Sequence, residues 1–303
     1  MAKAINLSVR EVGNAKQTHG CAGFYLKLAH CCVFLVISVF FQTSVLAQSY
    51  NDWVLKSFDH IDQNQLDSAE LALTEAMRLE PANPVNAMLL SNLGTLQRRN
   101  GKMPEAIVSY TAALSRAPQN MTFLANRASL FSEMGQPQNA LIDYSVLLEQ
   151  NPADEDVLYQ RGMLYLQLKN YEAAQIDFER IVELNPQTLD GRIGIASLCK
   201  LRREYDEAER IYIYLIDQIK DSPELYAGRA ELYLLMEKSG KAMSDANRAI
   251  ALQPENNPYV YILRARIKLL QFEKISAAND VKQALSMGYD SAEGEKLLKL
   301  CEK

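Results

Sequence analysis

Apolar side chains recur at helical spacing from residue 50 to the end of the chain. Within residues 155–187 the large apolar side chains share one stripe: Leu158, Tyr165, Phe178 and Ile181. Lys169 and Asn170 interrupt this stripe, and Pro186 ends it. The pattern predicts a helix, a short turn and a second helix. One such pair leaves an apolar face uncovered, so several copies must stack.

Related units lie on both sides of this one, at steps close to 34 residues. The seven units start at Tyr50, Ala87, Met121, Glu155, Leu189, Pro223 and Pro258. A small residue opens the second helix of every unit: Ala69, Ala106, Ala140, Ala174, Ala208, Ala242 and Ala277. All ten prolines fall at unit starts, in first helical turns or in connections, where proline is tolerated. The register therefore predicts an all-α fold.

A period of 34 residues built from helix-turn-helix units resembles the tetratricopeptide repeat family over residues 50–289. The resemblance implies an α-α superhelical solenoid of about seven repeats over residues 48–290. Residues 291–303 are expected to form a C-terminal capping helix with Ser291 as its N-cap. In this family ligands lie in an inner groove lined mainly by first helices, which implies a protein or extended-peptide partner.

The groove positions of the family fall on the first helices of the second, third and fourth units. Carried onto this chain, they are Ser91, Asn92, Thr95, Arg98, Asn126, Ser129, Glu133, Tyr159, Gln160 and Met163. Asn92, Asn126 and Gln160 share one place in three successive units. Such a ladder can hold a peptide backbone, because each amide offers a donor and an acceptor. The alternative is that these amides bond to local backbone or to water.

Arginine at the seventh place of a unit occurs together with aspartate at the twenty-third. The four combinations are Arg127 with Asp143, Arg161 with Asp177, Arg229 with Asp245, and Arg264 with Asp280. The other three units have neither residue. Antiparallel helices bring the two places side by side, so we expect a partly buried, bidentate ion pair in each of the four units. The alternative is a row of arginines that grips an anionic ligand.

Residues 1–47 differ from the rest of the chain. Lys27 precedes a largely apolar run over residues 31–41, and small residues stand before Gln48. This order is typical of a secretory signal peptide, here cleaved after Ala47. The run is shorter than the roughly 20 residues that span a bilayer. We expect export to the periplasm or cell envelope with no membrane span after cleavage; an uncleaved anchor is the alternative.

Charge and residue inventory exclude several functions. The chain holds 32 basic and 37 acidic residues, and its first 47 residues carry four of the basic ones and one acid, so the remainder is acidic. Without a basic cluster, nucleic acid is not expected as a partner. Removal of the signal leaves His60, Cys199 and Cys301, too few ligands for a zinc site. The two cysteines lie about three repeats apart and are not expected to bond.

No glycine-rich phosphate loop, nucleophile elbow or metal-ligand cluster follows the signal. We therefore expect no catalytic residue, no cofactor and no metal. The sequence favours a non-enzymatic protein-binding or peptide-binding scaffold of the cell envelope. One alternative is an accessory subunit of an envelope export or polysaccharide-assembly machine that positions an enzyme. Another is an enzyme whose catalytic groups are scattered over the groove.

Overall fold

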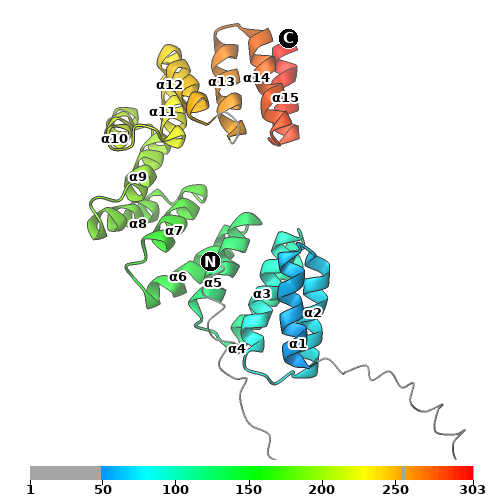
Figure 1. Ribbon diagram of the computed structural model, residues 1–303. Coiled ribbons are helices and arrows are strands. Elements are labelled where there is room, and N and C mark those ends of the chain that lie inside the picture. Colours follow the sequence, from blue (N-terminus) through cyan, green and yellow to red (C-terminus); the bar gives the residue numbers. More distant parts are fainter. Residues whose placement is uncertain (1–48, 254–256, 303) are drawn as a thin grey trace, which may run out of the picture. The chain divides into compact units, whose positions relative to one another are not determined.

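The computed structural model describes residues 49–253 and 257–302. Within them the chain forms fifteen α-helices and no strand (Figure 1). The helices are α1 (Tyr50–Asp62), α2 (Leu66–Leu79), α3 (Asn86–Arg99), α4 (Met103–Arg116), α5 (Met121–Glu133), α6 (Pro137–Gln150), α7 (Glu155–Gln167), α8 (Tyr171–Leu184), α9 (Asp190–Arg202), α10 (Tyr205–Gln218), α11 (Pro223–Leu235), α12 (Ser239–Leu252), α13 (Pro258–Leu270), α14 (Lys274–Ser286) and α15 (Ser291–Glu302). The predicted all-α repeat fold is confirmed. The predicted signal peptide lies outside the described residues.

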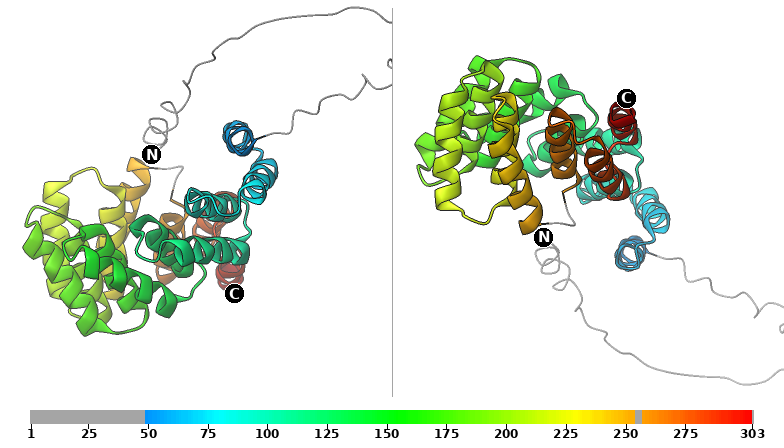
Figure 2. Two further views of the ribbon diagram at one scale, coloured as in Figure 1. Left: turned by 90° about the horizontal axis from the view of Figure 1, so that it is seen from below. Right: turned by 90° about the horizontal axis from the view of Figure 1, so that it is seen from above.

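Consecutive helices pair into hairpins, and each hairpin packs on the next (Figure 2). The first helix of every hairpin begins within one residue of the unit start expected from the sequence. First helices of neighbouring hairpins also touch, as in α3 with α5, α7 with α9 and α11 with α13. First helices therefore form a shared inner layer that can present side chains from several hairpins to one ligand.

One left-handed residue follows the first helix of every hairpin. These residues hold the same place in all seven units: Asn64, Gly101, Gly135, Lys169, Arg203, Glu237 and Phe272, with φ from 57° to 75°. Only two of them are glycine, although a residue with a Cβ loses roughly 1–2 kcal/mol in this conformation. Packing of the two helices therefore dictates the turn, even where the turn residue disfavours it.

Close approach of the helices depends on small residues. The seven alanines that open the second helices are fully buried. Phe178 of α8 is also fully buried and occupies the space of two missing side chains. A Cβ built on Gly162 would lie 2.5 Å from Phe178 Cε1, and one built on Gly194 would lie 2.3 Å from Phe178 Cδ1. Gly162 belongs to the same hairpin as Phe178, and Gly194 belongs to the next hairpin. One aromatic ring therefore packs against both hairpins.

Each arginine of the four Arg–Asp combinations donates two hydrogen bonds to its aspartate. The Nε and Nη2 atoms of Arg161 lie 2.8 and 2.7 Å from Asp177 Oδ2 and Oδ1, and the other three pairs have the same geometry. The aspartate side chains are 2–8% exposed and the arginines 17–21%. These hydrogen bonds raise the pKa of Arg161. The two donating atoms of each arginine are thus committed to a carboxylate inside the hairpin rather than to a ligand.

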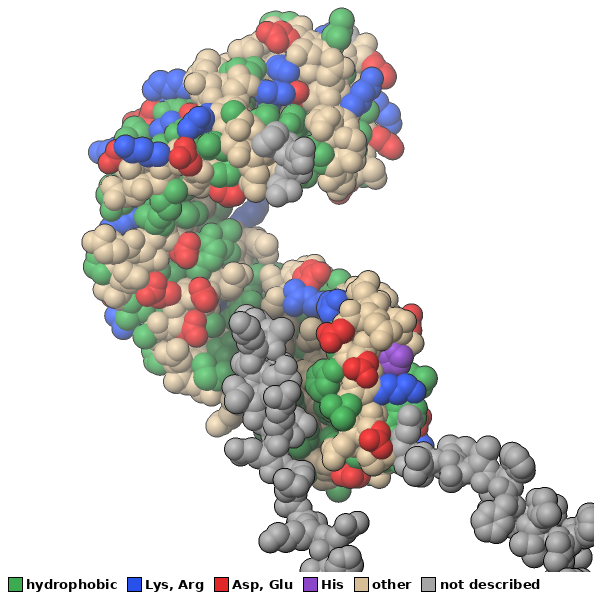
Figure 3. Space-filling model, in the orientation of Figure 1, with side chains coloured by type: hydrophobic (Ala, Val, Ile, Leu, Met, Phe, Trp, Pro, Cys, Tyr) green, Lys and Arg blue, Asp and Glu red, His purple; other side chains and the backbone are tan. Residues whose placement is uncertain are grey.

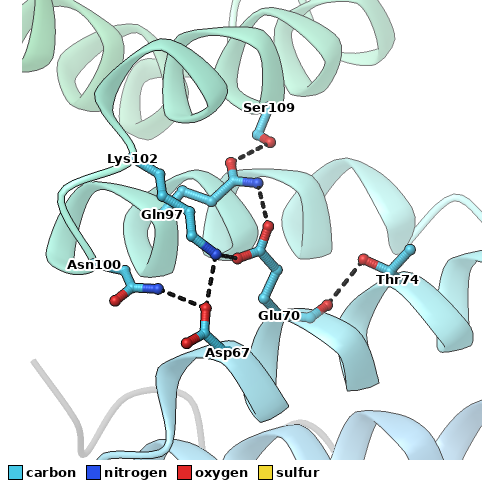
Figure 4. A network of polar contacts seen from close by, with 7 residues as sticks. All are labelled: Asp67, Glu70, Thr74, Gln97, Asn100, Lys102 and Ser109. Carbon is cyan, nitrogen blue, oxygen red and sulfur yellow. Dashed lines mark hydrogen bonds and ion pairs between the residues drawn. The ribbon is translucent and has the colours of Figure 1, made fainter.

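A polar network that the sequence did not indicate joins the first hairpin to the second (Figure 4). Lys102 Nζ lies 2.7 Å from Asp67 Oδ1 and 2.9 Å from Glu70 Oε2. Gln97 donates to Glu70 at 2.8 Å and accepts from the Ser109 hydroxyl at 2.7 Å. Hydrogen bonding to Asp67 and Glu70 raises the pKa of Lys102. Polar contacts as well as apolar packing therefore hold these neighbouring hairpins together.

The final helix, α15, packs on α14, and Leu297 and Cys301 are buried there. The prediction that Ser291 is its N-cap is wrong. Asp290 Oδ1 accepts instead from the backbone N–H groups of Ala292 at 2.8 Å and Glu293 at 3.2 Å. Aspartate and serine are comparable N-caps, and the carboxylate gains in addition from the helix dipole.

We predict that Asp177→Ala lowers the free energy of unfolding by about 3 kcal/mol, because Arg161 keeps a largely buried charge without a partner. Urea unfolding measures the loss. Glu183→Ala is the matched control, since it removes an exposed pair with Arg180 at 3.1 Å and should cost less than about 1 kcal/mol. Equally small losses in both variants would show that the buried pair does not stabilise the hairpin.

We predict that Gly194→Ala costs about 1–3 kcal/mol, because its methyl group would overlap the Phe178 ring. The cost should fall when Phe178→Leu is combined with it, and a double-mutant cycle in urea measures this coupling. Gly240→Ala in α12 is the control, since nothing lies within 4 Å of its Cβ. If Gly194→Ala proved as harmless as the control, the ring would not be held between the two helices.

Candidate functional site

A pocket of about 620 Å³ lies on the inner layer of the second, third and fourth hairpins. It is lined by Thr95, Arg98 and Arg99 of α3, Tyr110 of α4, Asn126, Ser129, Ser132 and Glu133 of α5, Tyr144 of α6 and Gln160 of α7. Six of these were expected to face a groove: Thr95, Arg98, Asn126, Ser129, Glu133 and Gln160. Three consecutive hairpins therefore contribute to one concave site, with hydroxyl and amide groups in the majority.

One of the two arginines that line this pocket is already paired. Arg98 Nε donates to Glu133 Oε2 at 2.7 Å, and Arg98 Nη2 donates to Ser129 Oγ at 3.1 Å. Arg98 and Glu133 side chains are 31% and 42% exposed, so solvent screens the pair. The contact links α3 to α5, and Arg99 is the lining arginine without an ion pair among the described residues.

Two tyrosines from second helices reach the pocket, and the sequence analysis missed both. Tyr110 and Tyr144 hold the place that the core residue Phe178 holds in the fourth unit, and they were not among the expected groove residues. Each is at least 96% buried, but each also lines the pocket. Burial raises the pKa of both phenols, which keeps them protonated and able to donate a hydrogen bond. The sequence signal that could have identified them is a hydroxyl-bearing side chain at a position otherwise used for core packing.

Ser91 does not face the groove, and its assignment as a ligand contact is wrong. Its side chain is 3% exposed, and its hydroxyl lies 3.4 Å from Asn126 Nδ2. The fifth place of the unit points at the next hairpin, so stacking covers it. Asn126 is therefore partly engaged by α3.

Three further groove candidates are half-buried outside the pocket. Tyr159 and Met163 pack against the core around Phe178, and the Tyr159 and Phe178 ring centroids are 6.0 Å apart. Asn92 does not line the pocket either. Of the three amides expected to form a ladder, the structure brings Asn126 and Gln160 into the pocket.

Later hairpins carry charged groups at the corresponding inner places, but these groups bind one another. Lys200 Nζ of α9 lies 2.6 Å from Glu231 Oε2 of α11, and the Tyr259 hydroxyl of α13 donates to Glu231 Oε1 at 3.1 Å. Arg266 is likewise paired with Glu293. These charged groups of α9, α11 and α13 are therefore paired with neighbouring helices, as Arg98 is in the pocket.

The outer layer carries a second feature that the sequence analysis missed. Four aliphatic residues repeat at the twenty-second place of the first four units: Leu71, Val108, Ile142 and Ile176, which are 59%, 68%, 62% and 66% exposed. Arg210, Ser244 and Asn279 hold this place in the last three units. We call the four aliphatic residues the outer row. Ile176 also lines a groove of about 450 Å³ against α6 and α7.

The described residues provide little for other chemistry. No group of three His, Cys, Asp or Glu side chains within residues 49–253 and 257–302 is placed to hold a metal ion. Cys199 and Cys301 are free and buried, and burial raises the pKa of Cys199 to about 11, far from that of a reactive thiol. None of the fifteen helices in these residues is long and apolar enough to span a membrane. On the face drawn in Figure 3, basic and acidic side chains are interspersed.

Comparisons with known proteins agree with this geometry. Residues 59–120 and 155–188 each match a family described as tetratricopeptide repeat. A tetratricopeptide repeat protein from Parabacteroides merdae ATCC 43184, known from a crystal structure, is 48% identical, with a TM-score of 0.80 over 85% of this chain and 100% of that one. In the APC/C hetero-tetramer Cut9-Hcn1, a chain 14% identical shares the fold alone, with a TM-score of 0.58 over 86% of this chain and 57% of that one.

Among curated proteins, the Protein SGT1 homolog of Oryza sativa subsp. japonica is 30% identical over 104 residues. The match covers 33% of this chain and only 27% of the rice protein, so it bears on a few repeats. The helix hairpins, their period and the full-length similarity to the Parabacteroides protein lead to one conclusion: the chain belongs to the tetratricopeptide repeat family.

Proposed function

We propose that this protein is a non-enzymatic scaffold of the cell envelope that binds an extended segment of a partner protein between α3, α5 and α7. Tetratricopeptide repeat proteins bind proteins or peptides, and they are generally scaffolds rather than enzymes. The observation that carries the proposal for this chain is the pocket that three consecutive hairpins line with hydroxyl and amide groups. Such groups suit the alternating donors and acceptors of a peptide backbone.

Uncharged groups carry the proposed recognition, and one arginine adds to it. Arg98 is paired with Glu133, whereas Arg99 makes one long hydrogen bond, 3.4 Å, to Asn64 and no ion pair with a described residue. The hydroxyl and amide groups would contact the main chain of the segment, and Arg99 could pair with one acidic group on it. Nucleic acid is not proposed as a partner. Export rests on the sequence of residues 1–47, and cell fractionation tests it: mature protein starting at Gln48 should appear in the periplasm or envelope.

An accessory subunit that positions an enzyme is the second candidate, and the outer row favours it. Exposed apolar surface that extends over several elements is typical of interaction sites, and the outer row places one large aliphatic side chain on each of four successive hairpins. Places 22 and 25 are uncharged in the first three units, where Thr74, Thr111 and Ser145 accompany the aliphatic residues. A folded envelope protein with an apolar surface would suit this strip, and its docking would leave the inner pocket open.

We predict that a photoreactive amino acid at Ser132 captures a specific partner in intact cells, because Ser132 lines the pocket. Asn126→Ala combined with Gln160→Ala should reduce this capture about tenfold, since each lost hydrogen bond costs about 0.5–1.5 kcal/mol. The same amino acid at Gln138, an exposed residue at the start of α6, serves as the control. Equal capture at both positions would count against a ligand in the pocket.

We predict that Ile142→Glu combined with Ile176→Glu removes a stably copurifying partner if the outer row is the docking surface, because two charges would have to lose their water. Both side chains are more than 60% exposed, so the thermal midpoint should stay within about 2 °C of the wild type. Gln138→Glu is the charge control. If the partner still copurifies with these variants and is captured at Ser132, it binds the pocket and not the outer row.

A further inference from the structure

The Tyr144 side chain is 4% exposed and lines the pocket, yet its hydroxyl has no hydrogen-bond partner within residues 49–253 and 257–302. Among the side-chain nitrogen and oxygen atoms of these residues, Arg192 Nε is the one that has no hydrogen-bond partner and no contact with solvent. The Tyr144 hydroxyl is therefore not sealed: the small exposed part of the residue includes it, and the space it meets is the pocket. A phenol whose ring is buried while its hydroxyl meets only a pocket is placed to bond to whatever fills that pocket.

A comparison with Tyr110 shows how Tyr144 differs. The two tyrosines hold the same place in consecutive units. The Tyr110 hydroxyl lies 3.0 Å from Thr95 Oγ1, the hydroxyl at the ninth place of its unit. The ninth place of the next unit is Ser129, whose Oγ accepts from Arg98 at 3.1 Å. Tyr144 therefore lacks the hydroxyl contact within its own unit that Tyr110 makes in the preceding one.

The next unit cannot provide such a group. Phe178 stands at the place of the tyrosines and has no hydroxyl, and Met163 stands at the ninth place. Gln160 of that unit also lines the pocket, is exposed, and forms no hydrogen bond with any described residue. Tyr144, Ser132 and Gln160 are thus hydrogen-bonding side chains without a partner among the described residues that the third and fourth hairpins direct to one space, and none is charged.

We infer that the Tyr144 hydroxyl is a ligand-binding group, which donates a hydrogen bond to an uncharged main-chain carbonyl oxygen of the bound segment. This rests on the proposed function in that the ligand is taken to be a peptide. Arg98 is already paired with Glu133, and Arg99 is the lining cation without an ion pair among the described residues. The test therefore includes acetate, which separates a carboxylate acceptor from a carbonyl oxygen. Gln160 extends the contact, since its amide can both donate to the segment and accept from it.

The test uses the full mature chain with tyrosine labelled by ¹³C at Cζ, and acetyl-tetraalanine amide as the probe. Titration at millimolar concentration should move the Tyr144 signal, and Tyr144→Phe should weaken probe binding about fivefold, the usual effect of one neutral hydrogen bond. Tyr144→Phe removes no protein partner, so its thermal midpoint should match the wild type. Tyr212→Phe is the matched control: Tyr212 holds the same place in the fifth unit and is 3% exposed, but it does not line the pocket, so probe binding should be unchanged.

Three results would overturn the inference: no Tyr144-dependent binding of the probe, unchanged affinity in Tyr144→Phe, or binding of acetate in place of the amide with strong weakening by salt. Failure of the proposed function is a different result. Capture at Ser132 in cells that persists undiminished in Tyr144→Phe would sink the role of the hydroxyl and keep the groove. Probe binding that depends on Tyr144, without any capture in cells, would keep the hydroxyl contact and reject the scaffold.

Discussion

Stacking of each helix hairpin on the next is the constraint on which the other features depend, because a single hairpin cannot bury its own apolar stripe. Phe178 shows how strict the contact is, since its ring fills the space above glycines of two different hairpins. The turn shows that stacking also overrides local preference. Lys169 and Phe272 adopt the same left-handed conformation as Gly101, although only glycine adopts it without cost.

This constraint explains which parts of the fold could be predicted from sequence. A position that requires a small residue in every unit, such as that of Ala174, can be recognised from the repeats in the sequence alone. The Arg161–Asp177 pair was equally visible, because arginine and aspartate appeared or disappeared together among the seven units. The N-cap at Asp290 was not visible, because Ser291 is an equally good candidate one residue later and only the backbone path decides between them.

The candidate site was less predictable, for a related physical reason. A first-helix residue can point to the inner layer and still be covered by the neighbouring hairpin, and Ser91 is covered in this way. Periodicity specifies a direction from the helix axis but not the distance to the next hairpin. The outer row was missed for the opposite reason, since Ile142 and its equivalents lie off the apolar stripe and looked like isolated surface residues.

Both halves of the inner layer contain polar groups. The halves differ in whether these groups have hydrogen-bond partners within the protein. Lys200 and Glu231 have strong charges but satisfy each other, and Arg98 is occupied by Glu133 and Ser129. Tyr144 differs from both: its hydroxyl has no hydrogen-bond partner within residues 49–253 and 257–302, whereas Tyr110, at the same place of the preceding unit, meets Thr95 at 3.0 Å. Because buried polar groups normally find partners, this difference between two repeats separates a tyrosine that only packs from one that is available to a ligand. In a stacked repeat protein, therefore, a residue at a packing position can offer its polar end to a ligand while its ring stays in the core.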